Sequence, residues 1–136
     1  MKITLLVATT LIVASMASLD ALEIPPGYHK IDANDAGLRG MYASFYNDLN
    51  QQAAKLMASK FGIKNFALPS KPHFLEAAEG NIDWSQNYLA TIMVGSVPSP
   101  SELCGYTFTF KMTMYEAIML PPSAEVYPTV QKNCYH

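Results

Sequence analysis

Apolar residues recur at spacings of three and four along residues 35–56. They are Leu38, Met41, Tyr42, Phe45, Leu49, Ala53 and Leu56. This spacing gathers them into one stripe and predicts an amphipathic helix with a single buried face. Asp35 is the expected N-cap, with Asn34 as the alternative, because either side chain can accept a hydrogen bond from a first-turn amide. Gly37 and Gly40 each weaken a helix by about 1 kcal/mol relative to alanine, so this helix depends on packing against another element.

Farther along the chain the period changes to two. Apolar residues (Tyr106, Phe108, Phe110, Met112 and Met114) alternate with polar ones (Thr107, Thr109, Lys111 and Thr113). Strict alternation predicts a strand with one buried side. Residues 87–94 are also strand-like, with apolar residues on both faces, and residues 73–78 and 126–131 are weaker candidates. A helix followed by about four antiparallel strands predicts an α+β layer structure with the helix covering the apolar face of the sheet.

The first 17 residues have the features of a secretory signal peptide. Lys2 gives a basic start, residues 3–13 are almost all apolar, and Ser15-Met16-Ala17 is a small-x-small cleavage site. The alternative, a membrane anchor, is less favoured because a spanning helix needs about 20 apolar residues. We therefore expect a secreted, extracellular protein in which residues 18–136 form one domain, with no membrane association.

The charge balance and the histidines argue against several kinds of chemistry. The chain has 9 Lys and Arg against 11 Asp and Glu, a net charge of −2, and no basic run, so nucleic acid is not an expected partner. His29, His73 and His136 are far apart and lack the spacing of metal ligands. We find no nucleophile motif and no phosphate-binding glycine loop. We therefore expect a protein that is not an enzyme and that uses no cofactor and no metal.

Two cysteines, Cys104 and Cys134, lie in the predicted exported domain. In an oxidising compartment a single pair is expected to form one disulfide. Closing a loop of about 30 residues would stabilise the fold by roughly 3 to 4 kcal/mol in the chain-entropy model. The alternative is two free thiols, with Cys134 available for a bond between chains. We favour the disulfide and a monomer.

Several motifs, taken in order, resemble the secreted cystatins, which inhibit papain-like cysteine proteases. They are Pro26-Gly27-Tyr28, Ile31-Asp32-Ala33-Asn34-Asp35, Tyr46-Asn47, Asn87-Tyr88-Leu89 with Val94-Gly95, and the pair Cys104 and Cys134. The resemblance covers most of the predicted mature chain. It implies one long N-terminal helix packed on a curved, four- to five-stranded antiparallel sheet, the arrangement that the hydrophobic pattern also favours.

The resemblance further implies reversible inhibition by a wedge of three tips that enters the active-site groove of the protease. In the family these tips are a glycine near the N-terminus, a hairpin loop reading Gln-x-Val-x-Gly, and a second loop with Pro-Trp. Gly27 matches the glycine, and Pro121-Pro122 lies where Pro-Trp would be. The first loop corresponds to residues 81–85 without a gap, or to residues 76–80 with an insertion. The expected protease-binding residues are Gly27, Glu79, Gly80, Asn81, Ile82, Asp83, Trp84, Ser85, Pro121 and Pro122.

Both tip loops depart from the family pattern. Either alignment of the first loop introduces a carboxylate, Asp83 or Glu79, which would cost several kcal/mol if buried unpaired in a groove. The second loop lacks its aromatic residue, and Trp84 is either an exposed contact residue or a lid packed on the sheet. Two hypotheses therefore remain. The partner is a papain-like cysteine protease, or it is another extracellular protein bound by a non-inhibitory cystatin-fold module.

Overall fold

A computed structural model describes residues 22–116 and 120–135 of the chain. The predicted signal peptide, residues 1–17, lies outside the described residues. The elements in chain order are β1 (His29–Ile31), α2 (Ala36–Phe61), β2 (Phe74–Ile82), β3 (Ser85–Ser99), β4 (Glu102–Tyr115), β5 (Ser123–Val126) and β6 (Gln131–Tyr135). Within the described residues, α2 is too polar to serve as a membrane-spanning helix.

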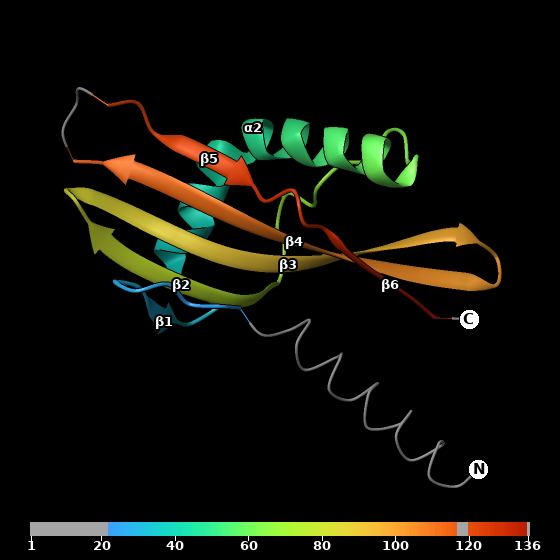
Figure 1. Ribbon diagram of the computed structural model, residues 1–136, viewed down its shortest axis with the longest axis horizontal. Helices are drawn as coiled ribbons and strands as arrows, with labels where there is room; N and C mark the ends of the chain where they lie inside the picture. Colours follow the sequence, from blue (N-terminus) through green and yellow to red (C-terminus); the bar gives the residue numbers. More distant parts are fainter. Residues whose placement is uncertain (1–21, 117–119, 136) are drawn as a thin grey trace, which may run out of the picture.

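The strands form one antiparallel sheet, and α2 packs on one of its faces (Figure 1). The strand order is β1-β2-β3-β4-β5, and β6 pairs with β4 beyond the end of β5. The α+β prediction, with one helix on an antiparallel sheet, is confirmed. The described part of the sheet has six strands instead of the four or five expected, because residues 29–31 add a short edge strand and the last edge is divided into β5 and β6.

The division of the last edge overturns the prediction of a strand over residues 126–131. Only the two ends of that range, Val126 and Gln131, lie in strands. Pro128 lies between them and has no backbone N–H, so it cannot donate to the ladder with β4. β5 therefore pairs with the stretch of β4 around Met112, and β6 pairs with the stretch around Gly105.

The predicted start of the helix is confirmed at Asp35. Its Oδ2 accepts a hydrogen bond from the Leu38 backbone N at 3.0 Å. The helix ends at Gly62, whose φ of 68° is left-handed and whose N–H bonds to the Ala58 carbonyl at 3.1 Å. The buried helix residues are Leu38, Met41, Tyr42, Leu49, Ala53 and Met57. Phe45 and Leu56 are only partly buried. The helix bends along its length (Figure 1), and Met57, four residues after the buried Ala53, is buried in place of Leu56.

The core lies between α2 and the inner face of β4. Tyr106, Phe108, Phe110 and Met112 are all buried there, as their alternation predicts. The Tyr42 ring lies 5.8 Å from that of Phe110 and 5.6 Å from that of Phe74, measured between centroids. Met114 is different, because 43% of it is exposed. It pairs with Gln86 at the end of the sheet, whereas α2 begins beside Tyr88, so no helical residue covers Met114.

Polar side chains of α2 add contacts that the hydrophobic pattern does not reveal. The Gln52 amide bonds twice to β5: its Nε2 donates to the Ala124 carbonyl at 2.8 Å, and its Oε1 accepts from the Val126 N–H at 2.8 Å. Gln52 thereby occupies backbone groups that an edge strand would otherwise leave open. The Tyr42 hydroxyl donates to the Pro69 carbonyl at 2.7 Å and fixes the connection between α2 and β2.

The predicted disulfide is confirmed. Cys104 in β4 and Cys134 in β6 are direct cross-strand partners, and their sulfur atoms are bonded. Cys104 is fully buried in the core cluster. The bond therefore attaches β6 to β4, an inner strand of the sheet, at the end away from the start of α2.

The two glycines at the start of α2 have opposite surroundings, which gives a matched test of the packing. A Cβ at Gly37 would collide with the Tyr88 hydroxyl, whereas a Cβ at Gly40 would meet nothing within 4 Å. Gly40→Ala should stabilise the fold by about 0.5 to 1 kcal/mol, the usual gain in a helix. Gly37→Ala should destabilise it by about 1 to 2 kcal/mol because the clash outweighs that gain. Urea unfolding measures both, and equal stabilisation by the two variants would contradict the packing of α2 against Tyr88.

Candidate functional site

Three segments that the sequence analysis singled out lie at one end of the sheet. We call this end the hairpin end and define it as residues 25–28, 82–85, 114–116 and 120–122. Figure 1 shows it at the left, where the β2–β3 turn, the end of β4 and the segment before β1 come together. A Cβ built on Gly27 would lie 3.2 Å from the Ile82 Cδ1 atom, and the Glu116 N–H donates to the Trp84 carbonyl at 2.9 Å. The structure therefore brings Gly27 close to the first tip loop and places the end of β4, which leads to Pro121-Pro122, beside that loop.

The β2–β3 turn consists of only two residues, Asp83 and Trp84. Ile82 and Ser85 on either side of it are paired in register. Asp83 has a φ of 50° and Trp84 a φ of 61°, so both adopt left-handed backbone conformations. Two-residue hairpin turns of this kind favour Asn-Gly, because glycine avoids the steric cost. A bulky tryptophan there costs about 1 to 3 kcal/mol and persists only where the surrounding structure holds it.

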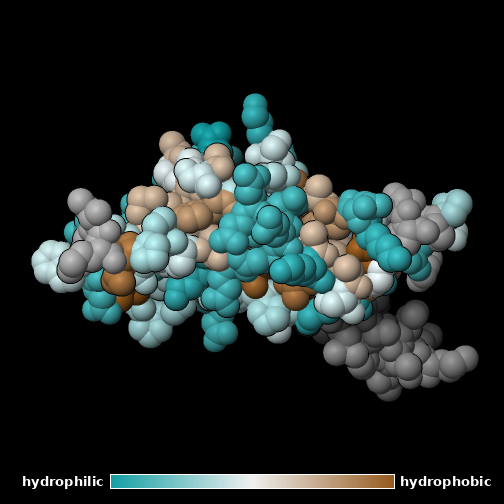
Figure 2. Space-filling model, turned by 90° about the horizontal axis from the view of Figure 1, so that it is seen from above, coloured by the Kyte–Doolittle hydropathy of each residue, from teal (hydrophilic) through white to brown (hydrophobic). Residues whose placement is uncertain are grey.

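The Trp84 side chain extends into solvent. It is 77% exposed, the highest value among the exposed large hydrophobic residues of the described chain. Of the two predictions for Trp84, the structure therefore has the exposed residue and not the lid packed on the sheet. Met114 and Leu120, which are 43% and 54% exposed, add apolar surface at the same end. Figure 2 shows hydrophobic residues there, beside atoms drawn in grey.

A buried polar network lies directly beneath the turn and holds it in place. The Asn87 Nδ2 atom donates to the Ser85 Oγ at 2.8 Å and to the Gly80 carbonyl at 3.3 Å. The Asn87 Oδ1 atom accepts from the Thr113 Oγ1 at 2.7 Å. Ser85, Asn87 and Thr113 are all at least 93% buried, and a fully bonded polar network of this kind rigidifies the backbone around it. Sequence reasoning missed the network, although polar residues within an otherwise apolar strand are its signal.

Glu79 and Gly80 do not belong to the turn, which corrects their assignment as tip residues. Both lie within β2, where Glu79 pairs with Tyr88 and Gly80 pairs with Asn87. Burial and then the nearby Glu79 carboxylate raise the pKa of Tyr88 above its usual value. Gly80 faces the Gly27 carbonyl so closely that a side chain would not fit. The alignment without a gap, residues 81–85, is therefore the one that coincides with the turn.

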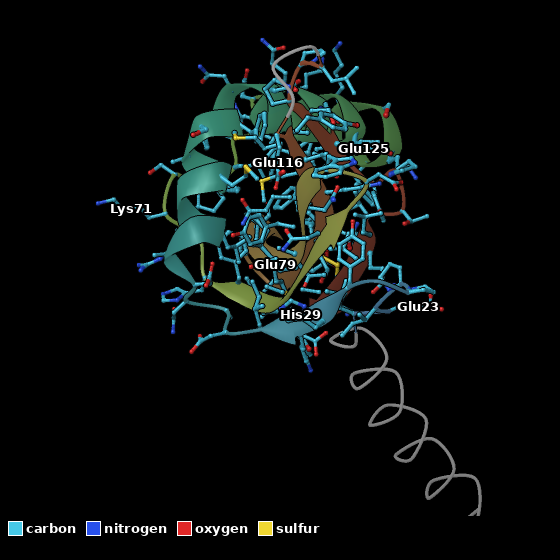
Figure 3. The ribbon with its side chains drawn as sticks, turned by 90° about the vertical axis from the view of Figure 1, so that its left-hand side faces the viewer. Glu23, His29, Lys71, Glu79, Glu116 and Glu125 are labelled. Carbon is cyan, nitrogen blue, oxygen red and sulfur yellow. A yellow bond between two sulfur atoms is a disulfide. The ribbon has the colours of Figure 1, made fainter. Side chains whose placement is uncertain are left out.

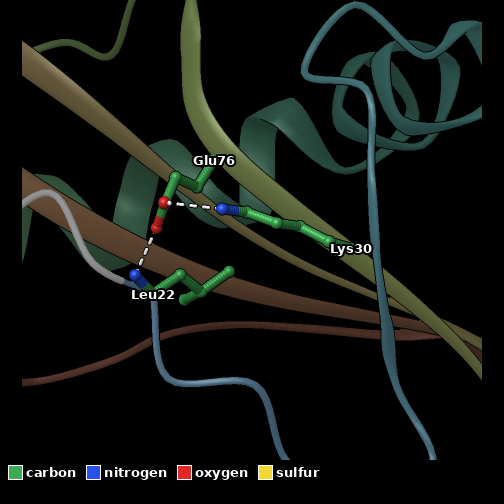
Figure 4. A network of polar contacts seen from close by, with 3 residues as sticks. All are labelled: Leu22, Lys30 and Glu76. Carbon is green, nitrogen blue, oxygen red and sulfur yellow. Dashed lines mark hydrogen bonds and ion pairs between the residues drawn. The ribbon is translucent and has the colours of Figure 1, made fainter.

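Gly27 lies at a bend of the backbone, with a φ of 87°. The preceding residues turn back over the face of the sheet opposite α2 and border an open groove of about 560 Å³ that also includes Leu89, Thr109 and Tyr127. Glu76 holds the segment there. Its carboxylate accepts from the Leu22 backbone N–H and forms an ion pair with Lys30 at 3.2 Å (Figure 4). The segment is docked on the domain and does not extend from it.

Pro121 and Pro122 lie between β4 and β5, at the same end of the sheet, and both are exposed. Residues 117–119 of this connection are outside the described part of the chain. Two consecutive prolines restrict the backbone, so this tip keeps the stiffness but not the aromatic side chain of the Pro-Trp pattern.

The described residues contain one group with the proximity of metal ligands, Glu102 with Cys104 and Cys134. Both sulfur atoms are used in the disulfide, so they are not thiolate ligands. His29 and His73 belong to different segments and are not part of that group.

Comparison of the chain with known proteins gives no match to any protein-family profile, to any curated protein or to any solved structure. The function must therefore be argued from the geometry of the hairpin end and from the residues there.

The strain at Trp84 predicts an unusual order of stability among variants. Trp84→Gly should be more stable than Trp84→Ala by about 1 kcal/mol, because only glycine removes the cost of the left-handed backbone. At an ordinary strand position the order would be reversed. Urea unfolding of both variants, compared at equal m-values, measures the difference. If the alanine variant is the more stable of the two, the turn does not have the backbone described here.

Proposed function

We propose that this protein is a secreted, reversible inhibitor of papain-like cysteine proteases that inserts its hairpin end into the active-site groove. The observation that carries the proposal is the exposed Trp84 on a strained two-residue turn, at the end of the sheet where Gly27 approaches Ile82 and where the connection with Pro121-Pro122 leaves β4. Strained residues persist where function retains them. An exposed tryptophan that contributes nothing to the core is best explained as a contact residue.

Rigidity supports this proposal. A tip that is already ordered loses little conformational entropy when it binds, so more of the contact free energy appears as affinity. The turn is fixed from below by Ser85 and Asn87, and from the side by the hydrogen bond between Glu116 and Trp84. The hairpin end is therefore preorganised as a wedge.

The position of the aromatic side chain also supports the proposal. Tryptophan is among the residues that most often dominate binding energy. The cystatin pattern has its tryptophan in the second tip, where this chain has Pro122. Trp84 lies in the first tip, and its carbonyl accepts a hydrogen bond from Glu116, at the start of the connection that carries the second tip. We propose that Trp84 supplies from the neighbouring turn the anchor that the second tip lacks.

The coarser features are compatible with a cystatin-like protein. They are the single helix on an antiparallel sheet and the one disulfide, a bond common in extracellular proteins. The predicted signal peptide agrees with secretion. In this proposal the protein acts as a monomer without a cofactor, and its partner is the protease.

A second candidate function is binding to another extracellular protein without inhibition. Asp83 favours it, because a carboxylate in the tip opposes insertion into a groove that offers it no partner. In that case Trp84 would be the contact residue on a different surface.

An inhibition assay tests the proposal. The oxidised protein is titrated into papain and cathepsin-like proteases with a fluorogenic substrate, and wild type is expected to inhibit at least one of them. Trp84→Ala should raise the inhibition constant about tenfold or more, because truncating a central aromatic anchor costs over 1 kcal/mol. Leu103→Ala is the matched control. It removes an apolar side chain that is 52% exposed at the opposite end of the sheet, and it should inhibit like wild type.

The outcomes separate the two functions. No inhibition by micromolar protein of any protease in the panel would contradict the first. Binding to a protease, measured by interferometry, with substrate cleavage unchanged would support the second. Equal loss of potency in Trp84→Ala and Leu103→Ala would show that the hairpin end is not the contact surface.

A further inference from the structure

The hairpin end combines apolar surface with negative charge. Asp83 is exposed beside Trp84 and forms no ion pair or side-chain hydrogen bond within the described part of the chain. Glu116 is also exposed, and its backbone N–H donates to the Trp84 carbonyl. Figure 3 views the molecule from this end and labels Glu116. Two acidic residues therefore adjoin Trp84, Asp83 as its neighbour in the chain and Glu116 through a backbone hydrogen bond.

The neighbouring sequence supplies little compensating charge. Residues 72–110 contain no lysine or arginine, and the acidic residues there are Glu76, Glu79, Asp83 and Glu102. Glu76 is already paired with Lys30. On β4, Lys111 lines one pocket together with Asp83 and is the cross-strand partner of Glu125, but no ion pair joins it to either carboxylate within the described residues. The Asp83 carboxylate is therefore exposed and is not ion-paired with any cation in the described part of the chain.

These charges restrict the partner, because a groove that closes over Trp84 must also desolvate the adjacent Asp83. An unpaired carboxylate in such a groove loses its hydration and weakens binding, whereas a cation in hydrogen-bonding contact restores the loss. Complementary charge also accelerates association, an effect that salt reduces. The same carboxylate that opposes a neutral groove therefore favours a cationic one.

We propose that the groove of the partner carries an arginine or lysine side chain beside an apolar pocket, with Trp84 filling the pocket and Asp83 pairing with the cation. This inference rests on the proposed function, and it adds a rule for selectivity. Asp83 directs the inhibitor toward proteases with a cationic groove entrance and away from those with a neutral or acidic one.

The test uses the protease that wild type inhibits most strongly. Association rate constants are measured by stopped flow at about 25 mM and about 250 mM sodium chloride, a range over which the screening length falls several-fold. The wild-type rate constant should fall several-fold with added salt. Asp83→Asn should associate several-fold more slowly at low salt, depend less on salt, and bind about tenfold more weakly.

Asp48→Asn is the matched control. It removes the same charge from the exposed middle of α2, away from the hairpin end, and should behave like wild type. An Asp83→Asn variant that binds as tightly as wild type, or more tightly, while wild type inhibits would overturn this inference and leave the proposed function intact. No inhibition of any protease by wild type would overturn both.

Discussion

The packing of α2 against β4 is the interaction on which the rest of the structure depends. Tyr42 is the clearest example, because its ring contacts Phe74 and Phe110 while its hydroxyl bonds to the Pro69 carbonyl. Burial raises the pKa of the Tyr42 phenol well above its usual value, so this hydroxyl stays protonated and able to donate. The same side chain therefore joins the helix, two strands and the connection to β2. The start of α2 beside Tyr88 also determines how far the sheet extends beyond helical cover.

That uncovered end of the sheet is where function is proposed. At this end, the residues that stabilise the β2–β3 turn differ from those proposed to bind a partner. Ser85, Asn87 and Thr113 are buried and mutually bonded, so they fix the backbone of the hairpin. Trp84 and Asp83 above them are exposed and have left-handed backbone conformations, so burial does not account for them, and contact is the role proposed for them.

Helical and strand periods predicted the elements with large apolar faces, because burial dominates their energetics. This accounts for α2 and for the alternation in β4, whereas the Asp35 cap followed from its side-chain chemistry and the disulfide from the single pair of cysteines. The interrupted last edge could not be predicted, since it depends on Pro128 and on the side chain of Gln52, which lies more than seventy residues away in the sequence.

The candidate site was only partly predictable. Counting residues left two alignments for the first tip, and only strand register distinguishes them, because it places Glu79 in a ladder and Asp83 in a turn. The proximity of Gly27, Trp84 and Glu116 is a tertiary property that no local pattern contains. The exposure of Trp84 likewise could not be predicted from the sequence, since tryptophan is usually well buried and only the backbone of the turn shows its direction.

The most direct test of the central packing is a measurement of proton contacts in solution by nuclear Overhauser spectroscopy. The structure predicts cross-peaks between the ring protons of Tyr42 and those of both Phe74 and Phe110. Their absence, in a spectrum where the Phe108–Phe110 contact within β4 is present, would show that the helix does not lie on the sheet as described. The described position of the hairpin end relative to α2 would then also be wrong.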